Sequence, residues 1–110
     1  MNVYTQGDIV WSVVTFREGL PSGLQGNAVD PEVVEFYYEP NGSAPSDTIT
    51  YTDATVPQVG VIARLGVGRY IVGIDTSDFL GETLEVWPVS GGYQVTGWKK
   101  FLVEPVGGSC

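Results

Sequence analysis

The side chains that most often perform catalysis or bind metals are scarce in this chain. Histidine is absent, and the only cysteine, Cys110, is the last of the 110 residues. Without histidine there is no Ser-His-Asp or Cys-His arrangement, and a zinc site would lack its usual ligands. Cys110 has no base beside it and lies outside the expected core, which argues against a nucleophile. We therefore expect no enzyme activity, no metal site and no cofactor.

Carboxylates are the remaining groups that could do chemistry. Three glutamates fall within residues 32–39, and three acids fall within residues 75–82. Glycoside hydrolysis needs two carboxylates that face each other across a cleft, and nothing in the sequence argues for a cleft. Oxygen-rich loops can bind calcium, but the spacing within residues 75–82 does not match the EF-hand loop. Solvated turn residues are the favoured interpretation of both groups.

The charge balance argues against two classes of partner. Thirteen acids and five bases give a formal net charge of -8. Nucleic-acid binding depends on clustered Lys and Arg side chains that neutralise phosphates, and only Lys99 and Lys100 are adjacent here. An anionic membrane surface would repel the same charge, and like-charged free copies repel one another. We expect neither nucleic-acid nor membrane partners.

The two ends of the chain give expectations about compartment and cross-linking. The N-terminal sequence MNVYTQGD has neither the basic nor the apolar region of a secretory signal, so we expect synthesis in a cytosol. One cysteine cannot form an internal disulfide. Cys110 ends a Gly-Gly-Ser-Cys sequence that we expect to be flexible. It is either an incidental exposed thiol or the site of an intermolecular disulfide between neighbouring copies.

The elements that must position these residues are expected to be β-strands. Valine occurs 17 times and aromatic residues 13 times, which favours strand over helix, and 15 glycines and seven prolines leave no room for a long helix. Short β-rich runs recur between turn signals, a pattern typical of a sandwich or barrel. The expected strands are Ile9–Arg17, Glu32–Glu39, Ser46–Asp53, Gly60–Leu65, Gly68–Asp75, Glu82–Pro88 and Tyr93–Val103.

This spacing predicts an all-β fold: an antiparallel two-sheet immunoglobulin-like sandwich of seven to eight strands without a disulfide. Residues 1–6 form an N-terminal arm or edge strand, residues 7–104 the sandwich domain, and residues 105–110 a flexible C-terminal tail. Glu18–Pro31 is expected to be a long surface loop. In Glu82–Pro88, Leu84 and Val86 are expected to face the core.

Large apolar side chains on outer faces are the strongest functional signal. In Ile9–Arg17, one face carries Val10, Ser12, Val14 and Phe16, and the other carries Ile9, Trp11, Val13 and Thr15. Trp and Tyr often anchor protein interfaces, so the outward aromatics indicate a covered patch. A one-residue error in phase would instead swap the two faces. The candidate protein-contact residues are Val3, Tyr4, Trp11, Val13, Leu20, Leu24, Tyr37 and Trp87.

Several phrases of the sequence resemble a known family. Three segments carry the resemblance, in the order GDIVWSVVTF, VDPEVVEFYYEPNG and GRYIVGID. In this order they resemble the small immunoglobulin-like proteins of tailed bacteriophages. The likeness covers most of residues 3–103, and its motifs are turn and core residues. The insertion-like segment Glu18–Ala28 and Pro88 depart from the pattern. The matching positions are Gly7, Asp8, Val10, Phe16, Asp30, Pro31, Val34, Phe36, Pro40, Gly42, Gly68, Tyr70 and Val72.

The resemblance implies a non-enzymatic structural protein of a phage particle, located in the virion and made in the host bacterial cytoplasm. The leading expectation is a capsid decoration or cement-like protein that docks on the shell through a sheet face or the N-terminal segment. Two alternatives stay open: a neck or tail accessory protein (connector, collar or tail-decorating), and a free carbohydrate or host-surface binding module. The implied partners are virion proteins of the capsid, neck or tail, and further copies of the chain itself.

Overall fold

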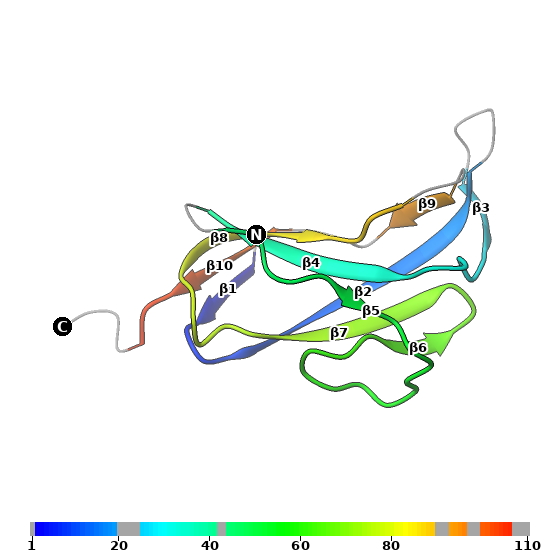
Figure 1. Cartoon of the computed structure of the whole chain (residues 1–110). Coiled ribbons are helices and arrows are strands. Elements are labelled where there is room, and N and C mark those ends of the chain that lie inside the picture. The colour runs from blue at the N-terminus through cyan, green and yellow to red at the C-terminus, as the bar shows by residue number, and fades with distance from the viewer. Residues whose placement is uncertain (1, 20–24, 42–43, 90–92, 97–99, 107–110) are drawn as a thin grey trace.

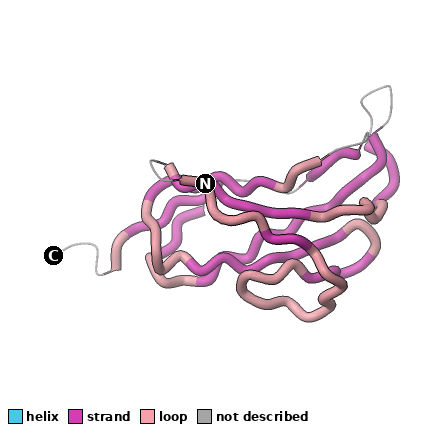
Figure 2. The backbone as a smooth tube through the Cα atoms, in the orientation of Figure 1, coloured by secondary structure: helices cyan, strands magenta, loops and turns pink. Residues whose placement is uncertain are grey.

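The computed structural model describes residues 2–19, 25–41, 44–89, 93–96 and 100–106. Within these ranges it contains strands and loops (Figure 2), and no helix long and apolar enough to cross a membrane. The strands are β1 (Asn2–Thr5), β2 (Ile9–Gly19), β3 (Gln25–Ala28), β4 (Glu35–Pro40), β5 (Ile49–Thr50), β6 (Ala63–Gly66), β7 (Arg69–Asp75), β8 (Gly81–Val86), β9 (Tyr93–Thr96) and β10 (Lys100–Glu104).

These strands form two sheets (Figure 1). The first sheet has the order β1-β10-β8-β4-β5, and the second has the order β3-β2-β7-β6, with β9 also paired to β2. The β1–β10 pair is parallel, whereas the other strand pairs are antiparallel. The all-β prediction with two sheets is confirmed, but the structure has ten strands where seven to eight were expected.

Two segments differ from the expected strand pattern because they pair with the last residues of β2, which extend beyond β7. β2 has 11 residues and β7 has seven, so the last residues of β2 need other hydrogen-bond partners. β3 supplies one partner, and it lies inside the segment expected to be a loop. β9 pairs with the last residues of β2 on the edge opposite β7, so the single strand expected over Tyr93–Val103 is two strands in different sheets. Another expected strand, Ser46–Asp53, is reduced to the two residues of β5.

The hydrophobic core lies between the two sheets, and both contribute fully buried side chains. The strongest prediction, the alternation of β2, is confirmed, as is the hairpin of β6 and β7 around Val67 and Gly68. The core residues are Val10, Val14, Phe16, Val34, Phe36, Ile62, Tyr70, Val72, Ile74, Phe79, Trp87, Phe101 and Val103.

The expected phase of β8 is wrong. Leu84 and Val86 are half-buried, whereas Glu85 and Trp87 are 1% and 4% exposed. The Trp87 ring lies between two core aromatics, with its centroid 6.3 Å from that of Phe16 and 4.8 Å from that of Phe36. Burying an indole removes more apolar area from water than burying a leucine or valine does. That gain favours the phase in which Trp87 points inward.

Candidate protein-contact surface

The strand β2 presents a buried face and an exposed apolar face. On the inner face, Ser12 and its neighbours at alternate positions are 0–1% exposed. On the outer face, Ile9, Trp11 and Val13 are 38%, 41% and 36% exposed. Because successive strand residues point to opposite sides, these three side chains share one side of the second sheet. They are named the β2 outer row below.

A glycine on β7 makes room for the Trp11 ring. Trp11 is the register partner of Gly73. A Cβ atom at Gly73 would lie 2.9 Å from the Trp11 ring and 3.0 Å from the Cα atom of Val59. The indole therefore lies against bare backbone. Val59 is 45% exposed, and Ile71 is half-buried opposite Val13, so apolar surface extends beyond the β2 outer row.

Three other candidate contact residues lie on the first sheet. Val3 on β1 is 55% exposed, and Tyr37 on β4 is half-buried. Tyr4 is half-buried, and its ring meets Phe101 edge-on with centroids 5.8 Å apart, so it packs against the core. The structure therefore brings Trp11 and Val13 together, but it does not join the first-sheet residues to them.

The remaining candidates are one buried residue and three that the structure leaves undescribed. Trp87, expected on an outer face, is 4% exposed and belongs to the core, so it is removed from the contact surface. Leu20, Leu24 and Cys110 lie outside the described residues.

A chain of buried polar groups, the Ser12 network, links the two sheets. The Trp87 indole Nε1 donates a hydrogen bond to Ser12 Oγ at 3.0 Å, and Ser12 Oγ donates one to Glu85 Oε1. Each of the three residues is at most 4% exposed. A buried carboxyl group is costly unless it is hydrogen-bonded. The Ser12 hydroxyl therefore helps to make an inward Glu85 compatible with the core.

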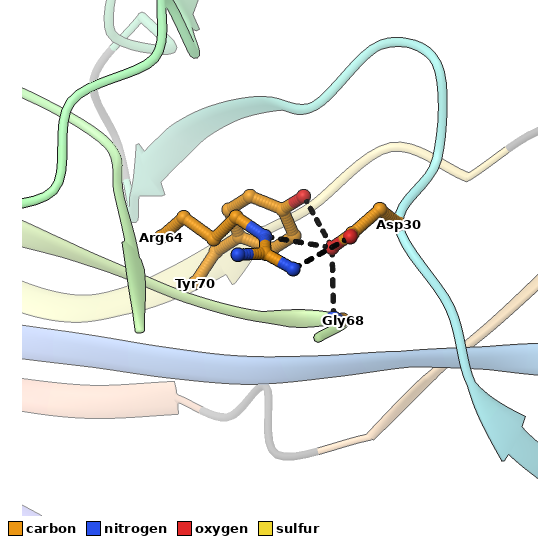
Figure 3. Close-up of polar contacts among 4 residues, drawn as sticks. All are labelled: Asp30, Arg64, Gly68 and Tyr70. Atoms are coloured by element: carbon orange, nitrogen blue, oxygen red, sulfur yellow. Dashed lines mark hydrogen bonds and ion pairs between the residues drawn. The ribbon is translucent and has the colours of Figure 1, made fainter. Parts of the chain in front are cut away.

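A second polar group, the Asp30 cluster, is formed by Asp30, Arg64, Gly68 and Tyr70 (Figure 3), and its Asp30 is exposed to solvent. Arg64 Nε and Nη2 donate to the two carboxylate oxygens at 3.1 and 2.8 Å. The Gly68 amide and the Tyr70 hydroxyl donate to Asp30 Oδ1 at 2.8 and 2.9 Å. These bonds tie the connection between β3 and β4 to the β6–β7 hairpin.

Gly68 is required in the Asp30 cluster for two physical reasons. Its φ is 70°, a backbone conformation that side chains disfavour. A Cβ atom there would also lie 2.6 Å from the carbonyl oxygen of Phe16. The glycine therefore lets the hairpin backbone approach both the end of β2 and the Asp30 carboxylate.

The contacts of the Asp30 cluster change the acidity of its members. The hydrogen bond from Arg64, aided by those from Gly68 and Tyr70, lowers the pKa of Asp30 to about 2. Burial of the phenol, followed by its hydrogen bond to Asp30, raises the pKa of Tyr70 to about 12. The bond to Asp30 also raises the pKa of Arg64. These shifts hold Asp30 ionised and Tyr70 protonated, which suits a structural connection.

The sequence did not reveal either polar group, because their members lie far apart along the chain. Asp30 is 34 residues from Arg64 and 40 from Tyr70, and Ser12 is 73 residues from Glu85. No short motif joins residues that far apart. The available signal was the polar Ser12 on the otherwise apolar inner face of β2; Glu85 gave none, because the sequence placed it on the outer face of β8.

Asp75, one of the three acids within residues 75–82, stabilises a turn. Asp75 Oδ1 accepts hydrogen bonds from the Ser77 amide at 2.9 Å and the Ser77 hydroxyl at 2.6 Å. The Thr76 hydroxyl donates to the Asp8 carbonyl at 2.8 Å. Among the residues that the structure describes, no group of three or more His, Cys, Asp or Glu is arranged to hold a metal ion.

Comparison with known proteins gives a plain result. No family model, no curated protein and no solved structure matches this chain. The β2 outer row is therefore interpreted from its own geometry.

Proposed function

We propose that the two sheets form an immunoglobulin-like sandwich. The neighbours β10-β8-β4-β5 correspond to strands G-F-C-C′ of a variable-type domain, and β2-β7-β6 correspond to B-E-D. Two features depart from this scheme. β3 and β9 are additional strands, and both pair with the last residues of β2. They extend one end of a domain whose principal dimensions are 52 × 30 × 21 Å.

On this framework, we propose a non-enzymatic module that docks onto another protein through the β2 outer row. The observation that carries the proposal is the exposure of Ile9, Trp11 and Val13 at three successive outward positions of one strand. A single exposed apolar residue is ordinary. A contiguous row that contains a tryptophan is typical of an interface, where aromatic residues often supply much of the binding energy.

We further propose that the partner is a structural protein of a tailed-phage particle, with the capsid shell as the leading site. The sequence resemblance supports this assignment. The net charge of -8 is consistent with it, because like charge keeps free copies apart until they meet a different surface. On the neck or tail, the chain would dock through the same surface, the β2 outer row.

The carbohydrate-binding alternative is weakened by one observation. A sugar platform built from Trp11 and Trp87 needs both rings at the surface, and Trp87 is 4% exposed. We therefore favour a protein partner for Trp11.

Co-sedimentation with purified particles of the phage that encodes the chain tests this function. We expect the wild-type chain to sediment at a fixed copy number and Trp11→Gln to lower the bound fraction by roughly tenfold, as loss of an interface anchor does. A matched pair of valines supplies the control: Val13→Gln weakens binding, whereas Val33→Gln, at a 61% exposed position before β4, does not. Circular dichroism verifies that each variant is folded.

Two results would count against the proposal in different ways. A wild-type chain that stays in the supernatant overturns the assignment to the particle. Folded Trp11→Gln and Val13→Gln variants that bind as well as the wild type overturn the β2 outer row as the docking surface.

A further inference from the structure

The β2 outer row lies beside an open backbone edge. Residues of an antiparallel pair direct their N–H and C=O groups alternately toward the partner strand and away from it. The Phe16 amide donates to the Gly68 carbonyl at 2.7 Å, and the Thr76 amide donates to the Asp8 carbonyl at 3.3 Å. The even-numbered residues of β2 therefore direct their backbone groups toward β7.

The odd-numbered residues direct their backbone groups toward the opposite edge. There β9, whose described residues end at Thr96, pairs with β2 over Thr15–Glu18. Within the described ranges, no strand or isolated bridge pairs with Ile9, Trp11 or Val13 on that edge. Among the described residues, the N–H and C=O groups of these three residues therefore have no partner strand on this edge.

The open edge lacks the usual protection against strand pairing. Proteins commonly guard a sheet edge with charged residues, proline or a bulge. Residues 9–14 read IVWSVV, without charge or proline, and their register with β7 is continuous. The neighbouring stretch of the same edge already holds a strand, because the chain leaves β8 of the first sheet and adds β9 to β2. An added strand at Ile9–Val13 would continue along the line of β9.

The charges around the edge define the occupant. Repulsion between two chains of net charge -8 disfavours a second copy. Asp8 is exposed at the Ile9 end of the edge, and Asp75, the register partner of Ile9 on β7, is exposed one strand away from the edge. A basic side chain at that end of an incoming strand would be attracted to both carboxylates.

We propose that the edge at Ile9, Trp11 and Val13 binds an extended segment of another protein by β-strand addition. The segment carries alternating apolar side chains and a Lys or Arg at the end beside Asp8, on the side of the nearby Asp75 charge. Its backbone bonds to the open N–H and C=O groups, and its outward side chains pack against the β2 outer row. This inference rests on the proposed docking function and specifies how docking occurs.

Amide hydrogen exchange in the isolated chain is the first test. We expect the Trp11 and Val13 amides to exchange at least tenfold faster than the Ser12 and Val14 amides, which bond to β7. Equal protection of all four amides in dilute protein would mean that the edge is already covered. Protection that increases with protein concentration would identify a second copy as the occupant. Either result overturns the proposal.

Co-sedimentation of edge variants with the purified particles is the second test. Val13→Pro removes the N–H group that faces the open edge but keeps the bonds to β7, because proline is tolerated at sheet edges. Val13→Thr is the matched control that keeps the N–H group and the β-branched shape. We expect Val13→Pro to lose binding at least tenfold, Val13→Thr to stay within about threefold, and Asp75→Asn to lose about threefold. If Trp11→Gln abolishes binding and folded Val13→Pro does not, the docking surface stands and strand addition is overturned.

Selection of random displayed peptides on the full chain provides a test that does not depend on the particle. Peptides with alternating apolar residues and a basic end should be enriched, and they should protect the Trp11 and Val13 amides when added to the wild-type chain. This exchange readout also decides the matter if Val13→Pro does not fold. Failure to enrich such peptides, or enriched peptides that leave both amides unprotected, overturns strand addition whatever the particle experiment shows.

Discussion

The Asp30 cluster and the Ser12 network each join segments that are distant in sequence, but the first lies at the surface and the second lies in the core. The Asp30 cluster joins a loop to a hairpin at the surface, where the Arg64 and Asp30 side chains are 35% and 39% exposed. The Ser12 network joins the two sheets inside the core, where Ser12 and Glu85 are 0% and 1% exposed. A surface ion pair contributes little because water and salt screen it. The free-energy cost of a buried carboxyl group depends strongly on each hydrogen-bond partner that it keeps.

This difference shows which polar residues decide the fold and which refine it. Glu85 and Trp87 share the inward face of the β8 segment, and Ser12 on the opposite sheet bonds to both. Loss of the hydroxyl therefore leaves two buried polar groups short of a partner. Asp30 instead lies where water can replace a lost partner. The predictions below test this contrast, beginning with the largest effect.

Ser12→Ala is expected to lower the free energy of unfolding by about 2 kcal/mol, because it removes a hydrogen bond from each of two buried groups. Urea unfolding followed by tryptophan fluorescence measures the change. A second substitution, Glu85→Met, removes the buried carboxyl at similar volume and should recover about 1 kcal/mol in the Ser12→Ala background. A cost below about 0.5 kcal/mol for Ser12→Ala alone would contradict the importance of the Ser12 network.

Asp30→Asn is expected to cost about 1 kcal/mol near neutral pH, since screening limits what an exposed pair contributes. The pKa of Asp30 is lowered to about 2 from 3.8, so its contribution is complete above pH 3.8 and is lost as the pH falls toward 2. The wild type should therefore lose stability over that range more steeply than Asp30→Asn. Urea unfolding at stepped pH measures the two slopes, and parallel slopes would contradict the assignment.

Salt is expected to affect the stability contributions of the Asp30 cluster and the Ser12 network differently. At about 1 M salt the cost of Asp30→Asn should shrink, because charges at the surface are screened over a few ångströms. The cost of Ser12→Ala should change little, since its network is buried. Equal salt dependence of the two variants would contradict the distinction between them.

Tyr70→Phe is expected to have the smallest effect, about 0.5 kcal/mol, because it keeps the buried ring and removes one hydrogen bond to a solvent-accessible acceptor. The pKa of Tyr70 is raised to about 12 from 10.0, so its contribution is complete below pH 10 and is lost as the pH rises toward 12. Thermal unfolding between those pH values should show a flatter decline for Tyr70→Phe. An unchanged decline would show that Tyr70 ionises alike in the folded and unfolded chain.

The success of the β2 prediction and the failure of the β8 prediction have one explanation. The alternation of β2 is long and has apolar residues on both faces, so the two-residue period of a strand was enough to predict it. The polar Ser12 on one face did not change that prediction. In β8, the choice lay between burying Leu84 and Val86 or burying Glu85 and Trp87. Local hydrophobicity favours the first pair. The hydroxyl of Ser12 and the aromatic neighbours of Trp87, all remote in sequence, stabilise the second.

The sequence by itself determined the all-β class and the alternation of β2, because strand period and residue type are local properties of the chain, whereas the exposure of Trp11 was settled by the packing of the two sheets. The tertiary structure decided the division of Tyr93–Val103 between two sheets, the inward turn of Trp87 and the Asp30 cluster. It also decided that the edge of β2 beside Ile9, Trp11 and Val13 is open among the described strands. These features depend on which distant backbone and side-chain groups supply hydrogen bonds, and alternation within one segment carries no information about such partners.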